Sequence, residues 1–295
     1  SAVTIDGGFY LGPQSFYEGL REAPPEMLAA INMTSVADVN ALYGNEAARR
    51  RERADARFIN IAMKATCLGA VISDALEDGR VVSGVGGQYN FVAQAHELED
   101  ARSIILVKAV REAGGKAESN IVWSYGHTTV PRHLRDIIIT EYGVADLRGK
   151  TDEECVRAML AITDARFIDG LVRDAIAAKK LPSDFTVPTA WRGNTPETIR
   201  RALSPHTGKL PAYPFGTELT EIEREIAPAL SYLSGQMAAP AKRAAFILSA
   251  LFAGPGAAAR AAFQPHLERL SLDAPASWKD RLTQRLVLKA LSKTR

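Results

Sequence analysis

Cysteine is scarce in this chain of 295 residues, which contains only Cys67 and Cys155. Neither has a partner at the spacing of metal ligands, so we expect two free thiols in a reducing compartment and no metal site. This usage predicts a cytoplasmic protein.

Long apolar runs are missing as well. No stretch reaches the roughly 18 apolar residues that a transmembrane helix requires, and no signal peptide precedes the first predicted strand. The sequence therefore predicts a protein that does not enter a membrane.

An excess of one charge is also absent. The formal net charge is +2 at pH 7, and no basic stripe alternates with aromatic residues, so nucleic acid is not an expected partner. The densest charged run, residues 46–57 (EAARRRERADAR), mixes acidic residues with arginine on a predicted helix. Such a mixture is typical of a solvated or ion-paired helix face.

What is present is the composition of an ordinary globular protein, with 46% hydrophobic and 24% charged residues. Up to about residue 150, short β-rich runs alternate with helical patterns. The expected strands lie within 57–66, 79–84, 103–110, 119–126 and 136–143, and the expected helices within 13–23 and 36–51. This alternation predicts an α/β fold with an open, mostly parallel or mixed sheet layered with helices. The continuous apolar runs IILVKAV and DIIIT favour strands covered on both faces.

From residue 151 the pattern becomes helical. Residues 151–181 predict two amphipathic helices, the first begun by a capping box of Thr151 and Glu154. A connector punctuated by Pro and Gly, 181–215, is expected to run extended over the core. The remaining residues are rich in alanine and leucine and predict helices at roughly 219–234, 239–253, 256–271 and 276–292. We therefore expect an α/β domain over 1–215, with its core at 5–180, and an all-helical extension over 216–295.

The most unusual stretch is SGVGGQYNF, residues 83–91. Three glycines, Gly84, Gly86 and Gly87, follow an apolar run, where glycine weakens a strand and packs nothing. A tight turn, a nucleotide-binding loop and an active-site loop would each use a backbone that approaches another group closely. A dinucleotide fingerprint is disfavoured, because the third glycine and the acidic residue after the next strand are missing.

Three other blocks help to choose between these alternatives. The loop is followed by SYGHTTVPRHLRDIIITEYGVADLRGKT (124–151) and preceded by FYLGPQSFY (9–17) and SVADVN (35–40). In this order the four elements resemble the acetyl-CoA hydrolase/transferase family, a branch of the class I CoA-transferases, over roughly residues 5–180. The resemblance implies the C-terminal one of the family's two similar α/β domains, with a CoA-transferase-like, Rossmann-like sheet.

The same resemblance implies an acyl-CoA hydrolase or CoA-transferase for short acyl-CoA, with coenzyme A as substrate and no permanently bound cofactor. In such enzymes a glutamate attacks the thioester, giving an acyl-glutamyl anhydride and then a glutamyl-CoA thioester, which water or a second carboxylate resolves. Each tetrahedral intermediate carries an oxyanion that needs preorganised N–H donors. Gly84, Gly86, Gly87 and Gln88 are therefore the candidates for the oxyanion and thioester loop.

Four other residues are candidates for binding CoA by their place in the matched elements. Asn40 matches an asparagine near the thioester, and Asn90 stands where many relatives have Asp. Lys108 matches a basic position that can meet phosphates, although a solvated lysine at a strand end is equally expected. His127 lies in a matched block, but a lone histidine is more often structural.

The rest of the matched block is assigned more simply. Arg132 and Glu141 are at least as well explained by a buried ion pair under the loop as by catalysis. Tyr142 and Arg148 are taken as structural.

The nucleophile is the departure from the family. In relatives the reactive glutamate lies in a Ser/Thr-Glu-Met segment upstream of the element matched by residues 9–17, so by order it falls before Ser1. We therefore expect this chain to hold the CoA-binding and oxyanion half of the site, to pair with an N-terminal domain of the same protein, and to be inactive alone. A homodimer is also expected, with water or a small carboxylate as second substrate. The alternative is a non-catalytic CoA-binding or regulatory module.

Overall fold

The computed structural model describes residues 3–113, 115–211, 213–214, 216–252 and 256–294. The chain divides into two compact units, one of Ser1–Gly12, Phe16–Arg111 and Ala117–Pro211, the other of Pro13–Ser15, Glu112–Lys116 and Ala212–Arg295. The predicted domains, 1–215 and 216–295, stay a prediction, and residue 215 at their border lies outside the described residues.

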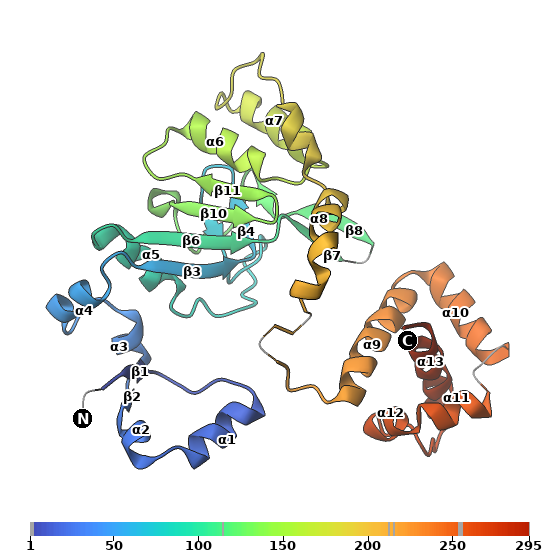
Figure 1. The fold of residues 1–295 in the computed structure, drawn as a ribbon. Coiled ribbons are helices and arrows are strands. Elements are labelled where there is room, and N and C mark those ends of the chain that lie inside the picture. The colour runs from blue at the N-terminus through green and yellow to red at the C-terminus, as the bar shows by residue number, and fades with distance from the viewer. Residues whose placement is uncertain (1–2, 114, 212, 215, 253–255, 295) are drawn as a thin grey trace. The chain divides into compact units, whose positions relative to one another are not determined.

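A four-stranded sheet with the order β11–β10–β6–β3 forms the centre of the first unit (Figure 1). Strands β3 (Arg57–Ala62), β6 (Arg102–Val107) and β10 (Ile137–Thr140) are parallel, and β11 (Gly143–Asp146) runs antiparallel to β10. The predicted open α/β sheet, mostly parallel, is confirmed. Its strands are the β-branched runs of the sequence, which fit a pleated, buried surface.

Shorter strands surround this sheet. Strand β4 (Lys64–Thr66) pairs with β5 (Val71–Ile72) in the antiparallel and with β9 (Ile121–Val122) in the parallel sense, and β1 (Ile5–Gly7) lies parallel to β2 (Ile31–Met33). Strands β7 (Val110–Ala113) and β8 (Lys116–Ser119) lie between β6 and β9 in the sequence.

The strand predicted at 79–84 is wrong. Within this run only Val81 makes an isolated bridge, to Ala75. The backbone N–H groups of Val82 and Ser83 both donate to the carbonyl of Asp74, at 2.8 and 3.1 Å. Because these two N–H groups close a turn, they are not available for hydrogen bonds to a neighbouring strand. The segment before the glycines is therefore a loop.

Helices cover one face of the central sheet. Helix α5 (Gln88–Glu97) packs on β3 and β6, α6 (Asp152–Ala161) packs on β11, and α7 (Ile168–Ala177) packs on α6. Helix α6 begins with the predicted capping box, in which Thr151 and Glu154 each bind the other's backbone N–H. The core under these helices includes Val92, Ile105, Val107, Ile138, Met159 and Leu160.

The opposite face of the sheet is exposed at its two edge strands, β3 and β11. The register aligns Ile61, Leu106, Ile139 and Val144 in one row across the four strands. At the two edges Ile61 is 76% and Val144 63% exposed, and Ile59 on the same face is 62% exposed. The prediction of strands covered on both faces concerned β6 and β10, whose Leu106 and Ile139 are half-buried on this face, and it stays a prediction. The edge strands β3 and β11 leave their apolar side chains exposed.

The remaining segments of the first unit are short helices. Helices α1 (Gln14–Glu22), α2 (Pro25–Ala29), α3 (Val36–Asn40) and α4 (Glu46–Glu52) precede the central sheet, and α8 (Pro196–Leu203) follows it.

The connector, predicted to be extended, is largely helical. Helix α8 lies between 3-10 turns at Thr189–Gly193 and Ser204–Lys209. The Thr195 side chain accepts a hydrogen bond from the Thr198 N–H, and Pro196 stands at the first helical position. Both features favour the start of a helix at this point. Phe185, Val187 and Trp191 pack on the core.

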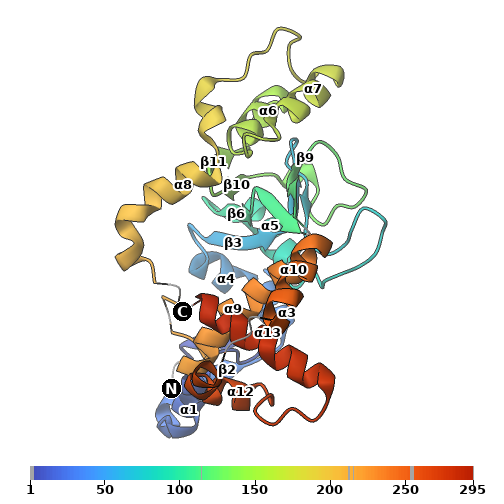
Figure 2. The same ribbon diagram turned by 90° about the vertical axis from the view of Figure 1, so that its right-hand side faces the viewer.

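The second unit is helical, as Figure 2 shows from another side. It contains α9 (Glu221–Ala238), α10 (Pro240–Phe252), α11 (Ala257–Ala262), α12 (Gln264–Arg269) and α13 (Trp278–Thr294). Four helices were expected, but the one predicted at 256–271 is two, since Pro265 in the first turn of α12 cannot continue a preceding helix. Residue 253 of the predicted 239–253 lies outside the described residues. Within the described ranges, every helix is too short or too polar to cross a bilayer.

Candidate functional site

The glycine loop leads directly into helix α5. Gly87 is the N-cap residue, and no side chain caps this end of the helix. Gly84 and Gly86 lie exposed before it, and Gly86 has a φ of +59°, which favours glycine. A helix start of this kind presents N–H groups without intrahelical partners and the positive end of the helix dipole. It is suited to bind an oxyanion.

Asn40 lies against this helix start. A Cβ at Gly87 would stand 2.6 Å from Asn40 Nδ2 and 2.8 Å from the ring of Phe91. Only glycine leaves room for both neighbours. The fold thus brings together two residues that the family resemblance assigned to one site from distant parts of the sequence.

Asn40 is held in place by groups that the sequence analysis did not identify. Its backbone carbonyl accepts a hydrogen bond from the side-chain amide of the buried Gln94, and Arg53 in turn donates to the Gln94 amide oxygen. Arg53 also donates to the carbonyl of Val39 at 3.0 Å. Arg53 belongs to the charged run expected to be a solvated or ion-paired face, but its hydrogen bonds to Gln94 and Val39 fix the segment around Asn40.

The Gln88 side chain points into the protein. It is 6% exposed and its Nε2 donates to the carbonyl of Ile61 at 3.1 Å, which ties the helix start to the end of β3. Its Oε1 is buried and accepts no hydrogen bond from the described residues. A buried acceptor costs about 1–3 kcal/mol when it stays unpaired.

His127 is connected to the glycine loop through Asp74. Its Nε2 lies 2.9 Å from Asp74 Oδ1, and the Thr129 hydroxyl donates to the same oxygen. These hydrogen bonds, that of Thr129 first, lower the pKa of Asp74. The Asp74 carbonyl accepts from Val82 and Ser83, immediately before the glycines. Asp74 was missed because nothing local in the sequence connects it with His127.

For Asn90 and Lys108 the structure describes no side-chain hydrogen bond with the glycine loop. Asn90 is exposed in the first turn of α5, and Lys108 is exposed directly after β6. The Lys108 carbonyl accepts from Asn120 Nδ2 at 2.9 Å. The Asn120 Oδ1 accepts from Lys64 Nζ, a second cation that the sequence analysis missed. Burial lowers the pKa of Lys64.

The expected buried ion pair of Arg132 and Glu141 is wrong. Arg132 is a largely exposed side chain that lies 3.3 Å from Asp152, while Glu141 accepts from the backbone N–H of Ala109 at 2.8 Å. Glu141 therefore holds the turn after β6 and does not form an ion pair with Arg132.

Tyr142 and Arg148 make internal contacts. Tyr142 donates to Asp164 at 2.8 Å, and burial together with that carboxylate raises the pKa of Tyr142. Arg148 lies 2.6 Å from the fully buried carboxylate of Asp136 and donates to the carbonyl of Ala95 in the last turn of α5.

The site therefore offers hydrogen-bond donors and cations. Within the described residues no group of three His, Cys, Asp or Glu side chains is placed to hold a metal ion. Both thiols are buried, and burial raises the pKa of Cys67 to about 12, so that it is not a nucleophile at neutral pH.

Comparison with known proteins identifies the fold around this site. A family model described as the acetyl-CoA hydrolase/transferase C-terminal domain matches residues 12–175. The match includes the glycine loop, Asn40, Lys108 and His127.

Individual relatives agree with the family model. A 4-hydroxybutyrate coenzyme A transferase of Clostridium kluyveri is 30% identical over 117 residues, which are 39% of this chain and 27% of that protein. A probable butyrate:acetyl-CoA coenzyme A-transferase of Syntrophomonas wolfei is 26% identical over 170 residues, 57% of this chain and 36% of that protein. The crystal structure of RipA from Yersinia pestis superimposes with a TM-score of 0.50 at 27% identity, covering 60% of this chain and 37% of RipA. This chain thus spans between a quarter and two fifths of the length of these proteins.

Proposed function

We propose a function from one premise: the chain belongs to the acetyl-CoA hydrolase/transferase family, of which it carries the C-terminal domain. The proposed activity is transfer of CoA from a short acyl-CoA to a second carboxylate, or hydrolysis of the acyl-CoA thioester, with this chain as the CoA-binding and oxyanion half. The observation that carries the proposal is the uncapped start of α5 at Gly87, with Asn40 directly beside it.

In this proposal the thioester carbonyl lies at the first turn of α5. A carboxylate attacks the carbonyl carbon, the C–O bond forms, and the oxyanion of the tetrahedral intermediate accepts from backbone N–H groups of Gln88 and its neighbours. Collapse of that intermediate breaks the C–S bond and releases CoA thiolate. The thiolate then attacks the acyl-glutamyl anhydride, giving the glutamyl-CoA thioester and the free carboxylate of the first acyl group. Water or a second carboxylate resolves the thioester.

Cations and polar side chains are proposed to hold the CoA. Lys108 is exposed at the carboxyl end of β6, where ligands of parallel α/β sheets bind, and is the candidate for a CoA phosphate. His127 acts through Asp74 on the base of the glycine loop, which makes it a positioning residue in this proposal.

The nucleophile is proposed to come from outside this chain, from a second α/β half of the same protein. Two observations support a partner of this kind. Glu141, the glutamate of the matched block, is engaged by the Ala109 N–H, and the row containing Ile61 and Val144 leaves one apolar face of a parallel sheet open. Parallel sheets are normally covered on both faces.

Titration with CoA tests the binding half of the proposal on the isolated chain. Calorimetry is expected to detect saturable CoA binding that Gly87→Ala weakens and Gly193→Ala does not. A Cβ at Gly87 meets Asn40, whereas one at Gly193, outside the loop, meets nothing within 4 Å beyond its chain neighbours. If the wild-type chain shows no saturable binding at millimolar CoA, the binding half of the proposal is overturned.

Trapping tests the covalent step in a longer protein in which an N-terminal domain precedes this chain. Incubation with butyryl-CoA followed by borohydride is expected to reduce a glutamyl-CoA thioester to the alcohol, a mass change that peptide mass spectrometry locates on one glutamate. Turnover of butyryl-CoA without any such adduct contradicts the glutamyl mechanism.

A non-catalytic CoA-binding or regulatory module is the second candidate, and Glu141 favours it because the structure commits that carboxylate to the backbone. It predicts CoA binding without turnover in the longer protein as well. Measurable turnover there excludes it.

A further inference from the structure

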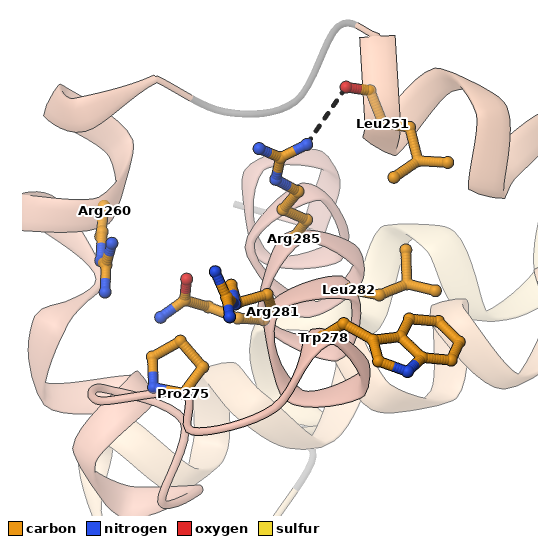
Figure 3. Close-up of a pocket in the computed structure, with 8 residues that line it drawn as sticks. Leu251, Arg260, Pro275, Trp278, Arg281, Leu282 and Arg285 are labelled. Carbon is orange, nitrogen blue, oxygen red and sulfur yellow. Dashed lines mark hydrogen bonds between the residues drawn. The ribbon is translucent and has the colours of Figure 1, made fainter.

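The helical unit contains a cavity of about 640 Å³. It opens between the end of α10, α11 and the first two turns of α13, and Arg260, Arg281 and Arg285 line it together with Trp278 (Figure 3). Its volume lies within the range of roughly 300–1,000 Å³ that small-molecule sites occupy.

Three arginines and no acidic side chain line this cavity. Arg281 and Arg285 are four residues apart on one helix face, an arrangement in which like charges repel each other. The nearest acid of the helix, Asp280, is used elsewhere: it accepts from the Ser277 N–H and hydroxyl at 3.0 and 2.7 Å. None of the lining side chains is acidic.

Two of the arginines are tethered to neutral groups. Arg260 donates to the carbonyl of Asp273 at 3.0 Å, and Arg285 donates to the carbonyl of Leu251 at 3.2 Å. Carbonyls fix the position of a guanidinium but leave its charge uncompensated. Planar guanidiniums held in this way bind phosphate oxygens in pairs.

One wall of the cavity is apolar and aromatic. Trp278 is 68% exposed at the start of α13, and Leu282 follows it one turn later on the same face. An indole left in water is an open stacking surface for a planar ring.

We propose that this cavity is a nucleotide site, in which a heteroaromatic ring stacks on Trp278 and two phosphate groups bind Arg260, Arg281 and Arg285. Each half of the cavity matches one half of such a ligand. The indole can stack on the ring, and the arginines can bind the phosphates. The proposal concerns the helical unit and does not depend on the acyl-CoA function of the first unit.

Calorimetric titration of the whole chain with ADP, pyrophosphate and adenosine tests the proposal. ADP is expected to bind more tightly than pyrophosphate, and adenosine to bind most weakly, because both the ring and the phosphates contribute. Arg281→Gln and Arg285→Gln should each weaken ADP at least about tenfold, since a hydrogen bond to a charged group contributes roughly 1.5–3 kcal/mol. ADP should also quench tryptophan fluorescence, and Trp278→Phe should remove that quenching.

Arg243→Gln is the matched control, because it removes the same charge from an exposed position of α10 that does not line the cavity. It should leave ADP binding unchanged. The proposal is overturned if ADP does not bind, if pyrophosphate binds as tightly as ADP, or if Arg243→Gln weakens ADP as much as the cavity variants do. ADP binding that Asn40→Ala abolishes and the cavity variants keep would place the nucleotide at α5 and overturn it as well. If ADP does not bind at the cavity, the proposal of CoA binding by the first unit is unaffected, because the CoA titration with Gly87→Ala tests it separately.

Discussion

The carboxamide of Asn40 occupies the space that a side chain at Gly87 would fill, with Nδ2 2.6 Å from the position of that Cβ. Asn40 ends α3, and Gly87 is the N-cap of α5. The contact joins an element of the N-terminal segment to the start of the helix that follows the glycine loop. In the proposed function it also places a polar side chain beside the oxyanion donors.

Gly87→Ala is expected to destabilise the chain by about 1–3 kcal/mol, the usual cost of forcing an extra methyl group into a filled space. The φ of Gly87 is −85°, so the cost is steric and not conformational. Urea unfolding followed by circular dichroism measures it.

Gly84→Ala is the control for that variant. No atom lies within 4 Å of a Cβ at Gly84, and its φ is not positive. Its free energy of unfolding should stay within about 0.5 kcal/mol of wild type. Equal losses for the two variants would mean that Asn40 and Phe91 do not confine Gly87.

The parts of the fold that the sequence predicted correctly rest on local signals. β-Branched runs mark β3, β6 and β10, and the Thr151–Glu154 pair marks the start of α6. In both cases the signal lies within the element itself, so no tertiary information is needed.

Three of the misses depend on backbone or side-chain groups outside the segment concerned. The run 79–84 has β-forming residues, but the Asp74 carbonyl takes the donors of Val82 and Ser83. The contacts of Arg53 with Gln94 and of His127 with Asp74 join residues 41 and 53 positions apart. Residue types alone do not encode such pairings, whereas the family resemblance did bring Asn40 and the glycine loop into one hypothesis.

Asp74→Asn is expected to remove a part of the acid dependence of stability. Hydrogen bonds from Thr129 and His127 lower the pKa of Asp74 in the folded state. The carboxylate therefore contributes stability that is fully present above its unfolded pKa of about 3.9 and is lost as the pH falls through the lower folded value. Melting temperatures measured between pH 7 and pH 2.5 should show a deficit for Asp74→Asn at neutral pH that shrinks in acid. Asp78→Asn, whose carboxylate is exposed and 4.0 Å from Arg80, serves as control. A deficit that is the same at every pH would contradict the assignment.

Arg148→Ala is expected to cost about 3 kcal/mol, because it leaves the fully buried Asp136 carboxylate with one cation fewer. Arg102 still binds Asp136 at 2.6 Å, which keeps the loss near the low end for a broken buried pair. Chemical denaturation measures the loss. Arg200→Ala breaks an exposed pair with Glu197 and should cost less than about 1 kcal/mol. If both variants lose the same stability, the buried network does not support the end of α5.

Ile61→Asp tests whether the open face of the sheet is an interface. In the isolated chain the side chain is 76% exposed, so the aspartate stays in water and the melting temperature should change little. In a longer protein with an N-terminal domain, the same aspartate would be buried without a partner, and removing an ionised carboxylate from water costs several kcal/mol. The expected result is a drop in melting temperature that occurs only in the longer protein. Ile138→Asp is the control, since Ile138 is 1% exposed in the core and its replacement should unfold both forms. An unchanged melting temperature for Ile61→Asp in the longer protein would show that its second half docks on a different surface.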